Sequence, residues 1–152
     1  MTEVLMPAGG GPHPAVVLGA EAYGVNSFIR GIQEKLIGLG YAVAVPDYYH
    51  GNGPAEPENY DDFTEVKEHI GRLDFTRGAR DLAGAVDALR AMPAIDPGRI
   101  AVWGYCTGGT LAWLAACPGH SFTCPRGPMR NEEADRAAWN DAMTFLSNQM
   151  GA

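Results

Sequence analysis

Residues 99–116 read RIAVWGYCTGGTLAWLAA, and this stretch decides the fold class. Residues 99–104 form a short, mostly apolar run that is typical of a buried strand, and residues 107–116 suit a helix. The junction, Gly104-Tyr-Cys-Thr-Gly-Gly109, is short and rich in glycine. The sequence therefore predicts a strand that passes into a helix through a sharp turn carrying a cysteine.

Two further apolar runs precede this junction. Residues 14–19 and 41–45 predict buried strands, bounded by proline, glycine and aspartate. Helices are predicted over 26–39, 60–72, 74–89 and 131–148. The alternation of strands and helices implies right-handed crossovers, a short, mostly parallel sheet and helices on its faces. We expect a three-layer α/β fold.

Two of these helices have readable ends and apolar faces. Asn26 and Asp74 are good N-cap residues, and Gly40 stands where a helix C-terminus favours glycine. The residues at helical spacing, which predict the buried faces, are Phe28, Ile32, Leu36 and Leu39 in the first helix and Phe75, Ala79, Leu82, Val86 and Leu89 in the second.

The composition bounds the class of protein. The chain has 152 residues, which fits one domain over 1–152, and 46% hydrophobic residues, enough for a packed core. Its net charge of −7 gives no general attraction for nucleic acid or anionic membranes. We expect no membrane-spanning segment, no signal peptide and, from three cysteines, a cytoplasmic protein without a disulfide framework.

The glycine-rich junction is a nucleophile elbow with cysteine at its centre. In the pattern Gly-x-Nu-x-Gly, the glycines two residues either side of Cys106 let strand and helix approach closely. The turn presents the sulfur at a helix N-terminus, whose dipole favours a thiolate. The backbone N–H of Thr107 would face a developing oxyanion. The alternative is a buried structural cysteine in a glycine-rich turn.

Four segments together resemble the dienelactone hydrolase family of the α/β-hydrolase fold. They are Glu21-Ala-Tyr-Gly-Val-Asn26, Tyr41-Ala-Val-Ala-Val-Pro-Asp47, Gly104-Tyr-Cys-Thr-Gly-Gly109, and Gly119-His-Ser-Phe122 with the Asn131 helix that follows. The resemblance covers residues 14–117, the nucleophile half, and extends to 119–152, the histidine segment and closing helix. It implies a hydrolase that opens a small-molecule ester or lactone through a cysteine thioester, without a cofactor or a metal.

The resemblance also implies roles for individual residues. Cys106 is the nucleophile and His120 the base, while the Glu21 carboxylate contacts the cysteine and helps it to switch between thiol and thiolate. The N–H groups of Thr107 and Ala22 form the oxyanion hole. Without the resemblance, Glu21 would be interpreted as a solvated loop acid.

The resemblance also predicts an incomplete fold. In the family, further strands and the triad aspartate lie between the nucleophile helix and the triad histidine. In this sequence only residues 117–119 separate the helix over 107–116 from His120. A helix over 107–116 travels about 15 Å away from Cys106 at 1.5 Å per residue, so His120 is not expected to reach the thiol within one chain. The apolar strand 99–103 becomes a sheet edge, and we expect it to pair in a homodimer.

Several other features have weaker interpretations. Cys117, His120 and Cys124 have metal-like spacing but supply only three ligands, so a plain turn is favoured over zinc. Gly9-Gly10-Gly11 is interpreted as a turn rather than a phosphate loop. His50 could line a pocket, but a solvated loop residue is favoured. Arg72 and Arg77 have no assigned role, and Trp103 is interpreted as core.

Three functions follow from the sequence. The first is an ester or lactone hydrolase of the dienelactone hydrolase family, with weak or no turnover because the triad aspartate segment is absent. The second is a shortened homologue that acts as a small-molecule-binding or self-associating module. The third is an acyl-thioesterase or carboxylesterase on the same fold.

Overall fold

A computed structural model describes residues 2–116 together with the single positions 136, 140 and 144. The chain divides into two compact units, Met1–Ala116 and Cys117–Ala152. In the second unit the three described residues, Arg136, Asn140 and Thr144, are helical and exposed. All three fall within the helix that the sequence predicts over 131–148. His120 and the possible zinc ligands lie outside the described residues.

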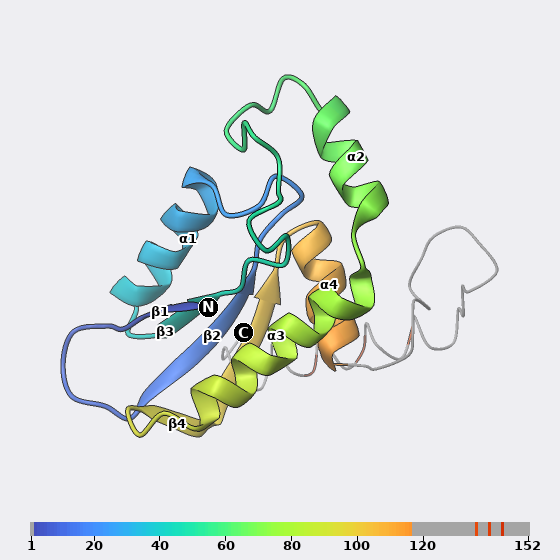
Figure 1. The fold of residues 1–152 in the computed structure, drawn as a ribbon. Helices are drawn as coiled ribbons and strands as arrows, with labels where there is room; N and C mark the ends of the chain where they lie inside the picture. Colours follow the sequence, from blue (N-terminus) through green and yellow to red (C-terminus); the bar gives the residue numbers. More distant parts are fainter. Residues whose placement is uncertain (1, 117–135, 137–139, 141–143, 145–152) are drawn as a thin grey trace. The chain divides into compact units, whose positions relative to one another are not determined.

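The first unit is built on a four-stranded mixed sheet (Figure 1). Its strands are β1 (Glu3–Leu5), β2 (His13–Gly19), β3 (Ala42–Val45) and β4 (Ile95–Gly104), in the spatial order β1-β3-β2-β4. β2 runs parallel to β3 and β4, and β1 is antiparallel to β3. The sheet is therefore mostly parallel, as the sequence predicts.

Four helices connect and flank the strands. They are α1 (Ser27–Gly38), α2 (Thr64–Arg72), α3 (Phe75–Arg90) and α4 (Thr107–Ala116). β3 and β4 lie on opposite sides of β2, so right-handed crossovers place α1 on one face of the sheet and α3 on the other. Figure 1 shows this arrangement, with α4 beside α3. The flanking helices and parallel strands confirm the predicted α/β class.

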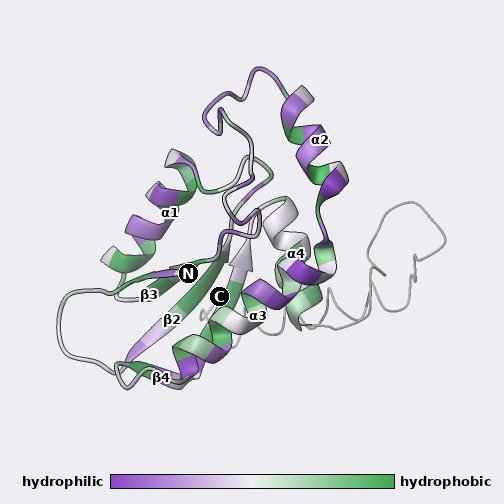
Figure 2. Cartoon of the chain, in the orientation of Figure 1, coloured by the Kyte–Doolittle hydropathy of each residue, from purple (hydrophilic) through white to green (hydrophobic). Residues whose placement is uncertain are grey.

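The core lies along the two central strands. Val17, Leu18 and Val43 are fully buried, and they pack with Ile29 of α1 and Leu82 of α3. Figure 2 shows the apolar strands flanked by α1 and α3, which carry both polar and apolar residues, and by α4, which is largely apolar. A strand that is buried on both faces of the sheet has apolar residues at consecutive positions. β2 and β3 are therefore recognisable in the sequence although apolar and polar residues do not alternate in them.

The predicted helix ends are confirmed. The Asn26 side chain accepts a hydrogen bond from the N–H of Ile29 at 3.1 Å, and Asp74 accepts one from the N–H of Arg77 at 3.0 Å. Gly40 has a φ of 92°, in the left-handed region that favours glycine after a helix. These caps satisfy N–H and C=O groups that a helix cannot satisfy internally.

The predicted buried face of α1 is confirmed at Leu36 and Ile32 and is wrong at Phe28 and Leu39. The buried side chains are Ile29, Gln33 and Leu36, whereas Phe28 is 44% exposed and Leu39 is 74% exposed. Neighbouring residues on a helix point about 100° apart, so apolar residues at the edge of the apolar stripe can lie on either the buried or the exposed side of the helix. The Phe28 ring instead packs edge-on against Tyr105, with the ring centroids 5.2 Å apart.

β4 also departs from its prediction. It begins at Ile95 rather than at residue 99, because the pairing with β2 is interrupted by a bulge and continues beyond it. Trp103 was expected in the core and is 47% exposed, stacked on Tyr105. Within the described part of the chain β4 pairs only with β2, so it forms the edge that the sequence predicts.

Among the described helices, none is long and apolar enough to cross a membrane.

Candidate active site

Cys106 occupies the turn between β4 and α4 in a strained backbone conformation. Its φ of 49° is in the left-handed region, which residues with a side chain rarely adopt. The residue is exposed, at the N-terminus of α4, with its Sγ 4.0 Å from the Thr107 hydroxyl. The geometry is that of a nucleophile elbow, which holds a reactive side chain out of the sheet.

The elbow is as tight as its glycines predict. A Cβ on Gly104 would lie 2.2 Å from the carbonyl oxygen of Gly108, and a Cβ on Gly108 would lie 2.2 Å from that of Ala20. Both distances are far below any real Cβ contact, so only glycine fits at either position. The glycines let α4 begin directly against the ends of β2 and β4.

The register of the sheet brings a second segment to the elbow. Gly19 of β2 pairs with Gly104 of β4, and the N–H of Tyr105 donates to the carbonyl oxygen of Gly19 at 3.1 Å. Residues 20–24, the loop after β2, therefore leave the sheet beside Cys106. We refer to residues 20–24 as the oxyanion loop, because Ala22 is the predicted second donor.

Both predicted donors have free backbone N–H groups. Thr107 is the first residue of α4 and Ala22 lies in a turn closed by a hydrogen bond from the N–H of Gly24 to the oxygen of Glu21, at 2.9 Å. Within the part of the chain that the structure describes, neither the Thr107 nor the Ala22 N–H has a hydrogen-bond acceptor. Two backbone amides without an acceptor among the described residues, beside Cys106, are the arrangement that the predicted oxyanion hole requires, and the roles of these residues stay predictions.

Two tyrosines that the sequence did not identify hold the oxyanion loop. The Tyr48 hydroxyl lies 3.2 Å from the oxygen of Ala20 and 2.5 Å from that of Glu21, and the Tyr49 hydroxyl donates to the oxygen of Ala22 at 2.8 Å. Burial raises the pKa of both phenols, so both stay protonated as donors. The only signal in the sequence was a pair of tyrosines just past the end of a buried strand.

The Glu21 side chain is bound to neighbours other than the thiol. Its Oε1 accepts hydrogen bonds from Asn26 Nδ2 at 2.8 Å and from the Tyr60 hydroxyl at 2.6 Å. Burial, followed by the bond to Glu21, raises the pKa of Tyr60 to about 12. No hydrogen bond joins Glu21 to Cys106 among the described residues, so a role for Glu21 at the thiol stays a prediction.

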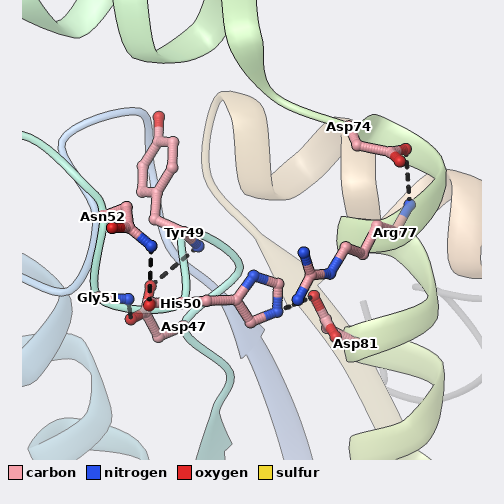
Figure 3. Close-up of polar contacts among 8 residues, drawn as sticks. All are labelled: Asp47, Tyr49, His50, Gly51, Asn52, Asp74, Arg77 and Asp81. Carbon is pink, nitrogen blue, oxygen red and sulfur yellow. Dashed lines mark hydrogen bonds and ion pairs between the residues drawn. The ribbon is translucent and has the colours of Figure 1, made fainter.

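His50 follows the two tyrosines and pairs with α3. Its Nε2 lies 3.0 Å from Asp81 Oδ2, and its φ is 55° (Figure 3). It also lines a cavity of about 320 Å³ with His69, Arg72 and Arg77. Of the two interpretations of His50, the structure therefore favours the pocket residue. Cys106 is not among the residues that line this cavity.

The positions just past β3 are held by short-range turns. Asp47 accepts hydrogen bonds from the N–H groups of Tyr49 and Gly51, at 3.0 and 2.7 Å. Figure 3 shows this turn below Tyr49, with the Arg77 side chain extending toward the His50–Asp81 pair. The turn fixes where both tyrosines leave the strand, and hence where their hydroxyls lie.

Comparisons with known proteins agree with this geometry. The model of the dienelactone hydrolase family matches residues 2–119. A carboxymethylenebutenolidase of Pseudomonas putida is 32% identical over 112 residues, which are 72% of this chain and 47% of the relative. Carboxymethylenebutenolidase 1 of Cupriavidus pinatubonensis is 35% identical over 106 residues, 68% of this chain and 45% of the relative. The chain spans about half the length of the curated relatives it matches.

Solved structures give the same fold. The structure described as m3DLH superposes with a TM-score of 0.60 at 32% identity, covering 88% of this chain and 66% of that one. A dienelactone hydrolase-like promiscuous phosphotriesterase, P91 from metagenomic libraries, superposes with a TM-score of 0.53 at 22% identity and shows the fold alone. The first unit thus has the α/β-hydrolase architecture that the sequence predicts.

Proposed function

The chain belongs to the dienelactone hydrolase family, and we propose that it opens an ester or a lactone through a thioester on Cys106. Residues 2–116 contain the groups proposed for the first half of this reaction, the transfer of the acyl group to the Cys106 sulfur. The observation that carries it is the position of an exposed, strained cysteine beside two backbone amides that have no acceptor among residues 2–116.

The first step is attack on the carbonyl carbon. The Cys106 thiolate forms a C–S bond, the carbonyl π electrons move to oxygen, and the N–H groups of Thr107 and Ala22 stabilise the resulting oxyanion. When the C=O bond re-forms, the C–O bond to the leaving group breaks. The alkoxide takes a proton and departs as an alcohol, or stays tethered to the acyl group when the substrate is a lactone.

The second step is hydrolysis of the thioester. Water adds to the acyl carbon, the same two N–H groups hold the second oxyanion, and the C–S bond breaks to give a carboxylic acid and the cysteine thiol. A base that removes the proton from water speeds this step. By family resemblance that base is His120, which lies outside the described residues. Because a helix over 107–116 travels about 15 Å away from Cys106 before the chain reaches His120, we do not expect His120 to contact the thiol, and we propose acylation faster than deacylation for this chain.

The test is acylation by p-nitrophenyl acetate. We expect a burst of p-nitrophenolate equal to one per chain, followed by slow turnover, and no burst from Cys106→Ala. Cys106→Ser is the matched control, because it keeps the elbow but supplies a hydroxyl that needs a base more than a thiol does. A burst that Cys106→Ala retains would overturn the proposal. Faster release from an acyl thioester than from a matched oxygen ester would favour the thioesterase.

A second candidate function rests on β4. The strand has a partner on one side only among the described residues, and Trp103 is 47% exposed at its end. An unpaired, apolar strand edge favours pairing with another strand, so we also propose that the chain self-associates through residues 99–103, as a cytoplasmic homodimer. Gel filtration over a range of concentrations tests this: Trp103→Lys should elute as a monomer, and a wild type that is monomeric throughout would contradict it.

A further inference from the structure

The oxyanion loop is held by hydroxyl groups from the far end of β3. Tyr48 is 3% exposed, and its hydroxyl is within hydrogen-bond distance of two consecutive carbonyl oxygens, Ala20 at 3.2 Å and Glu21 at 2.5 Å. A hydroxyl carries one proton, so its bond is directed mainly at the nearer oxygen, that of Glu21. This bond joins positions 27 residues apart in the sequence.

The carbonyl that Tyr48 binds belongs to the same peptide group as the Ala22 N–H. In a trans peptide the C=O and N–H bonds are coplanar and point in opposite directions. Fixing the Glu21 oxygen therefore fixes the direction of the Ala22 N–H. The Gly24 N–H binds the same oxygen at 2.9 Å, so both lone pairs are used, and rotation of this peptide would break two hydrogen bonds.

The environment of Tyr48 suits a permanent donor. Its ring is buried and packs against Tyr49, with the centroids 4.6 Å apart. Burial raises the pKa of Tyr48, and the neighbouring Tyr49, Cys106 and Glu21 add to the effect. The raised pKa keeps the phenol protonated, so that it can donate the hydrogen bond to the Glu21 oxygen.

We propose that Tyr48 is a positioning residue of the reaction: its hydroxyl orients the Glu21–Ala22 peptide so that the Ala22 N–H faces the oxyanion. The inference rests on the proposed function, because it concerns the acyl transfer at Cys106. Tyr48 touches neither substrate nor sulfur in this role. It acts through a peptide plane, and the elbow supplies the other donor, Thr107, independently of it.

Tyr49 is the internal comparison. Its hydroxyl binds the oxygen of Ala22, which belongs to the Ala22–Tyr23 peptide, and the N–H of that peptide is not a predicted donor. Tyr49→Phe should therefore affect acylation less than Tyr48→Phe. Tyr41, 37% exposed and without a hydroxyl hydrogen bond among the described residues, is the neutral control for a Tyr→Phe change.

The experiment compares two reactions of the same thiol. Acylation by p-nitrophenyl acetate passes through an oxyanion, whereas alkylation by iodoacetamide displaces iodide at a saturated carbon and forms none. In Tyr48→Phe we expect the acylation rate constant to fall by about 10- to 100-fold, less than the roughly 100- to 1,000-fold loss when an oxyanion donor is removed entirely. The alkylation rate constant should stay within about twofold of the wild-type value, because the surroundings of the Cys106 thiol are unchanged.

Three results would overturn the inference. Unchanged acylation in folded Tyr48→Phe would show that the peptide needs no clamp. Equal losses of acylation and alkylation would show damage to the elbow rather than to the oxyanion hole. Wild-type protein that alkylates but does not acylate would defeat the proposed function, and the inference with it.

A second variant covers the case in which Tyr48→Phe does not fold. 4-Aminophenylalanine in place of Tyr48 keeps the ring and offers an N–H donor at the same position. We expect it to fold and to retain acylation within about fivefold, since a neutral N–H···O bond replaces a neutral O–H···O bond. Loss of acylation in this folded variant, with alkylation preserved, would contradict the proposed role of the donor.

Discussion

The two predicted donors of the oxyanion hole are held in different ways. Thr107 is placed by sterics: Gly104 and Gly108 have no side chains, and the backbones on either side close to distances that no Cβ would permit. Ala22 is placed by hydrogen bonds from Tyr48 and Tyr49, residues of another part of the chain. The elbow therefore requires residues without a Cβ, whereas the oxyanion loop requires the hydroxyl groups of two tyrosines.

This difference decides what each substitution does. Adding a methyl group to the elbow forces backbone atoms apart, and the cost falls on folding. Removing the Tyr48 hydroxyl leaves the packing of the ring intact, and the change affects the orientation of the Glu21–Ala22 peptide. Substitutions in the two regions should therefore separate stability from reactivity.

Gly108→Ala should break the elbow. Its Cβ would lie 2.2 Å from the Ala20 oxygen and 2.3 Å from the Gly19 carbonyl carbon, both backbone atoms. We expect a loss of about 3 kcal/mol or more in the free energy of unfolding, measured by urea denaturation. Gly84→Ala on α3, which meets nothing within 4 Å, is the matched control and should stabilise by about 0.5–1 kcal/mol. Equal stabilities would contradict the steric account.

Asn26→Ala should loosen the base of the oxyanion loop. The side chain caps α1 and also donates to Glu21 and to the oxygen of Pro57, at 2.8 and 3.0 Å. Loss of the cap and of buried hydrogen bonds should cost about 2–3 kcal/mol in the free energy of unfolding.

Asn26→Ser separates the two roles of this side chain. It keeps a side-chain oxygen that caps α1 and removes the amide donor to Glu21 without adding a charge, so its loss of unfolding free energy should be smaller than that of Asn26→Ala. Urea denaturation of both variants under one set of conditions makes the comparison. Equal losses would show that the cap contributes little.

Tyr60→Phe should have the smallest effect. Tyr60 is 50% exposed, and its hydroxyl bond to Glu21 at 2.6 Å should contribute about 1 kcal/mol or less. The pKa of Tyr60, raised from 10.0 to about 12, means that the unfolded chain loses this proton first as pH rises. The contribution is therefore complete below pH 10 and is lost between pH 10 and 12. Ultraviolet titration of wild type and variant should differ by one tyrosine that ionises near pH 12.

The local features of the fold were predictable from the sequence. The strands β2 and β3, the caps at Asn26 and Asp74 and the elbow glycines are each encoded within a few neighbouring residues. Phe28, Leu39 and Trp103 were expected to be buried and are exposed, because burial depends on what packs against a segment from elsewhere in the chain. The tyrosine clamp was missed for the same reason, since it joins residues 27 and 28 positions apart.

The candidate site shows the same division. Cys106 and Thr107 follow from a six-residue pattern, and the structure places both in the expected turn. Ala22 and Glu21 came from family resemblance. Ala22 lies in the loop beside the elbow, while the Glu21 carboxylate binds Asn26 and Tyr60. The pairing of His50 with Asp81 was not predictable from neighbouring residues, because it joins the segment after β3 to α3.

The central claim is that Cys106 becomes acylated in an oxyanion hole formed by its own elbow and the oxyanion loop. Mass spectrometry after a short incubation with p-nitrophenyl acetate tests this directly, with fragment ions used to distinguish Cys106 from Cys117 and Cys124, which share its tryptic peptide. The account predicts one acetyl group per chain, on Cys106, formed in step with p-nitrophenolate release. An unmodified Cys106 in folded protein whose thiol still reacts with iodoacetamide would contradict it.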